Sequence, residues 1–332
     1  MKTKRLGRTG LKVTEVCLGT MTFGRQCDQP TAFRILDEAA RAGITFIDTA
    51  DVYPVPVSLD TAGRTEEIVG NWLKGRRNDF VVATKCRMQM GTGANDSGLS
   101  RRHILAAIEA SLSRLQTDYI DLYQVHSPDI DTPIDETLRA LESVVQSGKA
   151  RYIGCSNFQA WQLAVALWTS DRLGVTRFDC VQPRYNILYR EIEQELIPLC
   201  IDQQVGVIAY NPLAGGLLTG KHRRETPPAP DTRFAVVGQM YLDRYWNDFC
   251  FEAVERLQAF FRSRDKSLTH VAIAWLLGQP GITSAIVGAT SPEQLRDALC
   301  GVTVELDSEE LEECNRIWYG LPRIRDPRIA LR

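Results

Sequence analysis

Short apolar runs alternate with amphipathic stretches along most of the chain. Buried strands are predicted at 16–19, 46–48, 80–85, 120–126, 152–156, 180–182, 205–210 and 284–288. Helical periodicity recurs between them, at 30–42, 65–73, 100–115, 134–147, 161–173 and 192–202. Uninterrupted apolar strands that alternate with helices are typical of a parallel sheet covered on both faces.

The two ends of the chain add elements to this alternation. A glycine-bounded turn at 7–10 lies between two short runs and predicts a hairpin before the first buried strand. After the seventh strand comes a long excursion at 211–247, and further helices are predicted at 249–263, 269–277, 292–299 and 308–319. We therefore expect an α/β fold, a (β/α)8 TIM barrel with an N-terminal β-hairpin and extra C-terminal helices, as a single domain over 1–332.

The main competing fold is a doubly wound sheet that binds a dinucleotide. Such a sheet requires a Gly-x-Gly-x-x-Gly motif directly after an early strand. Gly19 and Gly24 have the wrong spacing, and the glycines at 91 and 93 lack the third member and follow no strand directly. The barrel is therefore the better interpretation.

Composition excludes several classes of function. The 39 basic residues nearly balance the 41 acidic ones, so no strong field favours nucleic acid or an anionic membrane. No apolar signal core follows the first residues and no run of about 18 apolar residues occurs, so we expect a cytoplasmic protein without a membrane span. The 9 cysteines form no CxxC pair, which indicates reduced, mostly buried thiols. The 4 histidines lack metal-ligand clustering, so no metal site is predicted.

Three successive strands each end on one ionisable residue. They carry Asp48, Lys85 and His126, and Tyr53 follows in the loop after the first of them. Each residue alone has an ordinary explanation: a strand end with a turn aromatic, a surface lysine, and a histidine at the rim. Because the carboxyl ends of barrel strands meet at one rim, we expect these four side chains to converge.

A converging Asp, Lys, Tyr and His can perform general-acid chemistry. A nearby ammonium lowers the pKa of a phenol from about 10 by roughly one to three units, so Lys85 would activate Tyr53. Asp48 would supply the counter-charge of Lys85, and His126 would orient a polar substrate oxygen. This set can protonate a carbonyl oxygen while hydride reaches the carbon. The hydride must come from a nicotinamide, because no side chain can donate one.

The same residues resemble a known family. The run at 46–53, the lysine that closes the third strand and the histidine that closes the fourth are similar to the tetrad of the aldo-keto reductase superfamily. The likeness covers nearly the whole chain and includes 18–21, 152–158, 181–186, 209–221 and 286–295. The segment 48–73, with its proline-rich insertion, is similar to the bacterial Tas-like branch, which is close to the potassium-channel β-subunit type.

The resemblance implies reduction of an aldehyde or ketone with NADP(H), with NAD(H) as the other candidate. It implies that Ser156, Asn157 and Gln182 hold the nicotinamide carboxamide and that Tyr210 stacks on the ring, although a tyrosine there could also be a packed core ring. The other implied cofactor contacts are Gly19, Thr20, Met21, Asn211, Pro212, Leu213, Gly215, Leu217, Gly220, Lys221, Arg233, Gly288, Gln294 and Asp297.

Two departures from the family pattern concern the adenosine end. Ala298 stands where relatives commonly have Asn, and no Lys or Arg occupies 289–291. Recognition of a 2'-phosphate would therefore fall to Arg233, Lys221 or Arg224, and on balance we favour NADPH over NADH.

A second class of function fits the same residues. A cofactor-sensing binding module of the channel β-subunit type would keep the barrel and the tetrad with little turnover. For the enzyme we expect a small-molecule carbonyl substrate and no nucleic-acid or membrane partner, in a monomer or a homo-oligomer. Trp161 and Trp168, seven residues apart on one helix, are interpreted as ordinary helix packing. The tail at 323–328 is interpreted as a solvated end, with a fold over the site mouth as the alternative.

Overall fold

The structure is a computed structural model that describes residues 1–323. These residues form two units, each described by itself. The first comprises 1–184, 192–210 and 280–296, and the second comprises 185–191, 211–279 and the residues from 297 onward. The expectation of one domain over 1–332 stays a prediction.

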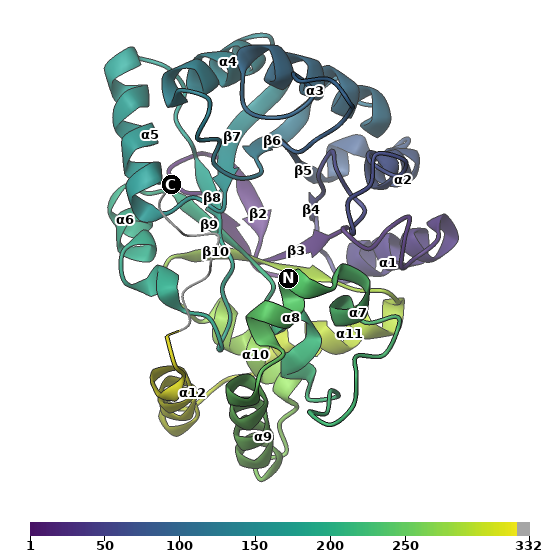
Figure 1. The fold of residues 1–332 in the computed structure, drawn as a ribbon, viewed down its shortest axis with the longest axis vertical. Helices are drawn as coiled ribbons and strands as arrows, with labels where there is room; N and C mark the ends of the chain where they lie inside the picture. The colour runs from purple at the N-terminus through teal and green to yellow at the C-terminus, as the bar shows by residue number, and fades with distance from the viewer. Residues whose placement is uncertain (324–332) are drawn as a thin grey trace. The chain divides into compact units, whose positions relative to one another are not determined.

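Eight parallel strands close into a barrel in the first unit. Their order is β10-β3-β4-β5-β6-β7-β8-β9, and helices α1 to α6 lie around the outside of the strands (Figure 1). The strands are β3 (Val16–Gly19), β4 (Phe46–Asp48), β5 (Val81–Cys86), β6 (Ile120–Val125), β7 (Ala150–Ser156), β8 (Cys180–Gln182), β9 (Gly206–Tyr210) and β10 (Ile282–Gly288). The predicted (β/α)8 barrel is confirmed.

The helices that cover the barrel begin and end close to their predicted bounds. They are α1 (Gln29–Arg41), α2 (Arg64–Leu73), α3 (Arg101–Leu115), α4 (Ile134–Gln146), α5 (Ala160–Leu173) and α6 (Leu196–Asp202). Local capping explains two of the starts, because the side chains of Asp28 and Ser100 accept hydrogen bonds from the first-turn amides of α1 and α3. Helix α6 starts four residues later than predicted. Pro198 lacks an N–H and fits only in the first turn of a helix, so 191–193 form a separate 3-10 turn instead.

An apolar cluster fills the lower part of the barrel. Its members are Leu6, Val13, Cys17, Phe46, Ala83, Leu122, Cys180, Ile208 and Ile286. Leu6 and Val13 come from the N-terminal hairpin, in which β1 (Thr3–Arg5) pairs antiparallel with β2 (Lys12–Thr14). The hairpin therefore contributes to the barrel core as well as preceding it.

The strand register explains why polar side chains meet above this core. Asp48 pairs with Ala83, and Lys85 lies two residues further along β5, so both side chains share the inward face. Lys85 in turn pairs with Gln124 of β6. The polar layer thus follows the apolar layer at the carboxyl end of the strands.

The second unit is mostly helical. It contains α7 (Arg233–Val237), α8 (Gln239–Tyr245), α9 (Asp248–Arg262), α10 (Leu268–Leu277) and α12 (Ser308–Gly320), together with the 3-10 helices η3 (Ala214–Thr219) and η4 (Gly301–Thr303). Helix α11 (Pro292–Cys300) belongs to the first unit up to Arg296 and to the second from Asp297. Helices α7 and α8 and η3 lie in the excursion at 211–247 and were not predicted, because they are too short to show a helical period.

The expectations for the two tryptophans and for membrane-spanning helices can be compared with the structure. Trp161 and Trp168 of α5 are 53% and 63% exposed, so the expectation of ordinary helix packing was wrong. A spacing of seven residues places both on one face of the helix, and their exposure shows that this face is the outward one. Within residues 1–323, no helix is both long enough and apolar enough to cross a membrane.

Candidate active site

A buried ion pair forms the centre of the polar layer. Lys85 is fully buried and Asp48 is 3% exposed, and the Lys85 Nζ donates to Asp48 Oδ2 at 2.5 Å. The same ammonium donates to the carbonyl oxygen of Thr49 at 2.8 Å. Burial opposes the charge, but the Asp48 carboxylate and then Tyr53 outweigh it, so the pKa of Lys85 lies above its usual value. The lysine is therefore an ammonium at any physiological pH.

Tyr53 lies against this ammonium. The Lys85 Nζ is 5.1 Å from the centroid of the Tyr53 ring. The backbone around Tyr53 is anchored on both sides, because its N–H donates to the Ala50 carbonyl and its own carbonyl accepts from the Thr65 N–H at the start of α2. The residue is 9% exposed. The loop therefore holds the tyrosine at the rim, with its ring beside the positive charge.

His126 completes the group. Its ring lies 5.7 Å from the Tyr53 ring in an edge-to-face arrangement. Burial first, and then the charges of Lys85 and Arg87, lower the pKa of His126 to about 3. The imidazole is therefore neutral at physiological pH and can donate or accept one hydrogen bond. The four residues of the predicted tetrad are thus brought together in the first unit.

Sequence reasoning missed the role of Gln124. Its Nε2 donates to Asp48 Oδ1 at 3.2 Å, and the Nε2 of Gln182 donates to the same oxygen at 2.8 Å. Gln182 also donates to Gln124 Oε1 at 3.3 Å. The signal was present, because Gln124 is a polar residue inside an apolar run. Together the two amides satisfy the carboxylate oxygen that Lys85 does not reach.

The expected nicotinamide contacts of the first unit lie at the ends of neighbouring strands. Ser156 ends β7, and its hydroxyl donates to the Gln182 carbonyl at 2.8 Å. Asn157 donates to the His126 carbonyl at 2.9 Å and accepts from the Tyr210 hydroxyl at 2.9 Å. Tyr210 is half-buried, so part of its ring remains available to a ligand. These bonds link the expected cofactor residues to the tetrad.

The comparison with known proteins decides the family. Residues 15–319 match the profile of the Aldo/keto reductase family. The chain belongs to this family. Membership supports an oxidoreductase that acts on carbonyl compounds.

Several aldo/keto reductase relatives match over nearly their full length. The chain is 41% identical to the "uncharacterized oxidoreductase YrpG" of Bacillus subtilis, covering 95% of both chains. It is 38% identical to a "probable voltage-gated potassium channel subunit beta" of Arabidopsis thaliana, covering 92% of both. It is 33% identical to "protein tas" of Escherichia coli, covering 96% of this chain and 97% of the relative. The predicted likeness to the Tas-like and channel β-subunit-like branch is confirmed.

The expected contacts at 19–21 begin at Gly19, the last residue of β3. The backbone N–H and the hydroxyl of Thr20 both donate to the Asp48 carbonyl, at 3.1 and 2.9 Å. Gly19 permits a close approach of β10, since a Cβ there would lie 2.6 Å from a methyl carbon of Ile286. Met21 follows directly and accepts a backbone hydrogen bond from Val55. Hydrogen bonds thus connect this segment to the strand that carries the catalytic candidate Asp48.

The expected phosphate loop at 211–221 lies in the second unit. Gly215 and Gly216 have φ values of 72° and 103°, and Asn211 and Gly220 also have positive φ. The Asn211 side chain accepts from the Gly215 N–H at 2.6 Å. Successive left-handed residues make a concave backbone whose N–H groups suit an anion. The remaining members of the expected set here are Pro212, Leu213 and Leu217, which belong to the same turn.

The basic residues expected near the cofactor phosphates differ in their surroundings. Lys221 is exposed, and the Arg233 guanidinium lies 5.9 Å from the centroid of the Tyr241 ring. Arg224 lies between the carboxylates of Asp248 and Glu252, with distances of 3.6 Å to each. The charge of Arg224 is therefore already matched by these two carboxylates.

Two of the three residues expected at the adenosine end, Gln294 and Asp297, have internal side-chain partners. Gln294 Oε1 accepts from the N–H and the hydroxyl of Thr290, at 3.0 and 2.8 Å. Gly288 ends β10 and is exposed. Asp297 Oδ1 is 3.0 Å from His270 Nε2. The role of each in cofactor binding stays a prediction.

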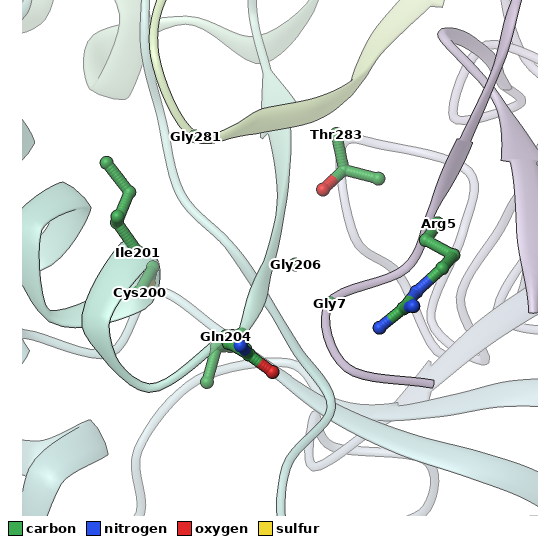
Figure 2. Close-up of a pocket in the computed structure, with 9 residues that line it drawn as sticks. Arg5, Gly7, Cys200, Ile201, Gln204, Gly206, Gly281 and Thr283 are labelled. Carbon is green, nitrogen blue, oxygen red and sulfur yellow. The ribbon is translucent and has the colours of Figure 1, made fainter. Parts of the chain in front are cut away.

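A separate hollow lies at the opposite end of the barrel. Its volume is about 410 Å³, and it is lined by Arg5 and Gln204 and by residues at the amino ends of β9 and β10, such as Gly206 and Thr283. Figure 2 shows that these residues come from different elements around an open space. Lys85 lies at the carboxyl end of β5, so this hollow is not the site described above. Among the described residues, no three His, Cys, Asp or Glu side chains are grouped to hold a metal.

Proposed function

We propose that this aldo/keto reductase reduces an aldehyde or ketone to an alcohol with NADPH, and that Tyr53 donates the proton. The observation that carries the proposal is the buried Asp48–Lys85 pair, which holds an ammonium 5.1 Å from the Tyr53 ring. A stable ammonium favours the phenolate that is left after proton transfer and so makes the phenol a better acid.

The other site residues have complementary roles. Asp48 keeps Lys85 charged in a buried place, and Gln124 and Gln182 hold the second oxygen of that carboxylate. His126 stays neutral and donates a hydrogen bond that orients the substrate oxygen toward Tyr53. The nicotinamide supplies the hydride when it is bound. Ser156, Asn157 and Gln182 fit the carboxamide because they offer both donors and acceptors at the strand ends beside His126.

NADPH is proposed over NADH because Lys221 offers a positive charge to a 2'-phosphate. In the second unit, Lys221 is exposed, whereas Arg224 is engaged with two carboxylates. Arg233, beside Tyr241, is the other candidate. The left-handed turn at Gly215 and Gly216 supports pyrophosphate binding at the same loop.

A cofactor-sensing module is the second candidate. The observation that favours it is the 38% identity to a relative named as a probable potassium channel subunit beta. The tetrad does not separate the two functions, because a sensor can retain it. Turnover does separate them.

The test uses fluorescence titration with NADPH and NADH, followed by steady-state assays on 4-nitrobenzaldehyde, methylglyoxal and a broader carbonyl panel. If the protein is an enzyme, we expect repeated turnover. Tyr53→Phe should lower the turnover rate by at least about 100-fold and change the cofactor affinity by no more than about threefold. Tight cofactor binding with a single slow turnover across the panel would instead support the sensing module.

A further inference from the structure

Arg87 is a cation at the rim that the proposed mechanism does not use. It follows Cys86 directly, and Cys86 pairs with Val125, so Arg87 and His126 are the next residues along two adjacent strands. Its backbone has a φ of 130°, a conformation that side chains other than glycine rarely adopt. Its carbonyl accepts from the Gly98 N–H at 2.8 Å, which closes the loop at 88–98 back onto the rim. The protein thus maintains a strained arginine beside the site.

The guanidinium of Arg87 has few hydrogen-bond or ion-pair partners among the described residues. The residue is half-buried, and its Nε is buried without a hydrogen-bond partner among the described residues. Its Nη1 lies 3.9 Å from the sulfur of Met88, which is a weak acceptor. No carboxylate of residues 1–323 forms an ion pair with it. A partly desolvated arginine in this state retains the capacity to bind an anion.

The carboxylate of Asp129, which the charge of Arg87 influences, forms its hydrogen bonds with other groups. Asp129 Oδ2 accepts from the Leu99 N–H and from the Thr132 hydroxyl, both at 2.7 Å, and Oδ1 accepts from the Asp131 N–H at 3.2 Å. Burial opposes the charge of Asp129, but these bonds and the more distant charge of Arg87 keep its pKa below the usual value. Asp129 therefore shapes the loop and leaves the fork of the guanidinium open.

The positive charge of Arg87 also acts on His126. It is one of the charges that hold the imidazole neutral, after burial and Lys85. Lys85 is ion-paired with Asp48, whereas no carboxylate of residues 1–323 forms an ion pair with Arg87, so the guanidinium places a positive charge beside His126. Such a charge attracts a negatively charged substrate and repels a cationic one.

We propose that Arg87 selects carbonyl substrates that carry a carboxylate, which the guanidinium binds while His126 and Tyr53 hold the carbonyl oxygen. The inference rests on the proposed reductase function and names its substrate class. The planar fork of Arg matches a carboxylate with two parallel hydrogen bonds, which Lys cannot reproduce. An ester of the same substrate, which has no negative charge, should lose the contact with Arg87 and keep its contacts with His126 and Tyr53.

The test compares 4-carboxybenzaldehyde with its methyl ester, methyl 4-formylbenzoate, as substrates with NADPH. We expect the wild-type kcat/KM to favour the carboxylate by at least about tenfold, mainly through KM. Arg87→Gln should remove most of this preference by raising KM for the carboxylate, with less than about threefold change for the ester. Arg87→Lys should restore part of the preference, and salt should weaken the preference in the wild type and in Arg87→Lys but not in Arg87→Gln. Arg102→Gln, which removes an exposed arginine from α3, is the matched control and should leave both substrates unchanged.

A binding measurement makes the test independent of turnover. Calorimetric titration of the protein–NADP⁺ complex with terephthalate, an unreactive dianion, should show binding that Arg87→Gln weakens by about tenfold or more and Arg102→Gln does not. Equal losses for both aldehydes in Arg87→Gln, or unchanged preference together with unchanged terephthalate binding, would overturn the inference and leave the proposed function standing. If no aldehyde is turned over, the proposed function fails, and terephthalate binding still decides whether Arg87 forms an anion site.

Discussion

Asp48 and Asp51 are two buried carboxylates on one short segment, and their surroundings are opposite. Asp48 points into the barrel, where it accepts hydrogen bonds from Lys85, Gln124 and Gln182. Asp51 is fully buried, and neither of its carboxylate oxygens has a hydrogen-bond partner among the described residues. The first carboxylate meets a cation and two amides, and the second meets none of these.

The neighbours of Asp51 explain the difference. The fully buried Glu66 of α2 accepts from the Thr84 hydroxyl at 2.5 Å and from Arg114 Nε at 2.7 Å. Thr84 is adjacent to Lys85 on β5, so it points to the outer face of the barrel wall. Burial, followed by the negative charge of Glu66, raises the pKa of Asp51 well above its usual value. Similar burial therefore has different consequences: Asp48 is paired with a cation inside the barrel, whereas the pKa of Asp51 is raised by burial and by a neighbour of like charge, which the charges of Arg114 and Lys85 offset only in part.

The strongest way to break the comparison is to remove the cation from Asp48. Lys85→Met leaves that carboxylate buried and unpaired, which should cost about 3–5 kcal/mol of unfolding free energy. It should also lower kcat for 4-nitrobenzaldehyde by about 10² to 10⁴, because Tyr53 loses the ammonium that stabilises its phenolate. Urea unfolding and steady-state kinetics measure the two effects.

A double variant separates stability from chemistry. Lys85→Met combined with Asp48→Asn removes both charges, so it should recover most of the lost stability and none of the activity. Recovery of turnover in the double variant would show that the pair has only a structural role.

Asp51→Asn should have the opposite effect on stability. The pKa of Asp51 is raised in the folded state, so the folded protein loses stability as the pH rises above the pKa of the unfolded chain, near 4. Asparagine does not titrate, so the variant does not lose this stability. The variant should be roughly 1–3 kcal/mol more stable than the wild type at pH 8, and this gain should vanish below pH 4, where Asp51 is protonated in both states. Turnover should stay within about threefold. The account would be contradicted if the stability difference between Asp51→Asn and the wild type became less favourable to the variant from pH 4 to pH 8.

Asp179 is a less buried carboxylate than Asp48 and Asp51, and it provides a third case for the comparison. Burial raises the pKa of Asp179 to about 6, and the backbone bond at Ile153 and the charge of Arg177 offset only part of this. Asp179→Asn should therefore gain about 1–2 kcal/mol of stability relative to the wild type between pH 4 and 6, and the gain should level off above pH 6. Unfolding titrations at several pH values check this window. A flat difference across the range would show that Asp179 is not held neutral.

The smallest expected effect is on the pH–rate profile. Because the pKa of His126 is lowered to about 3, its imidazole should stay neutral throughout the usual assay range. The kcat/KM for a neutral aldehyde should therefore show no limb near pH 6.5. A limb at that pH that disappears in His126→Gln would mean that the imidazole titrates normally and that its surroundings are more polar than the structure indicates.

Strand order and the tetrad could be predicted from the sequence because both depend on local patterns. Each buried strand is an apolar run, and Asp48, Lys85 and His126 each stand at or just beyond the end of one. The rule that barrel strands deliver their carboxyl ends to one rim then brings them together. Gln124 could have been found by the same rule, since it interrupts an apolar run.

The roles of Asp51 and Arg87 could not be predicted, because they depend on contacts that no local pattern reveals. Asp51 reads as an ordinary polar residue in a loop until Glu66, 15 positions later, is placed against it by the packing of α2 on the barrel. Arg87 reads as a loop residue until its neighbours are shown to leave its charge unmatched. The short helices α7 and α8 escaped prediction for a related reason, since tertiary packing stabilises them and periodicity does not.

The most direct test of the central claim follows the hydride and the proton donor together. NADPH deuterated at C4 of the nicotinamide is mixed with the protein and 4-nitrobenzaldehyde, and the alcohol is sampled by mass spectrometry through a single turnover. We predict that the wild type places the deuterium on the former carbonyl carbon, and that Tyr53→Phe does so at least about 100-fold more slowly with cofactor bound to the same extent. Label transfer by Tyr53→Phe at the wild-type rate would contradict the assignment of the phenol as the acid.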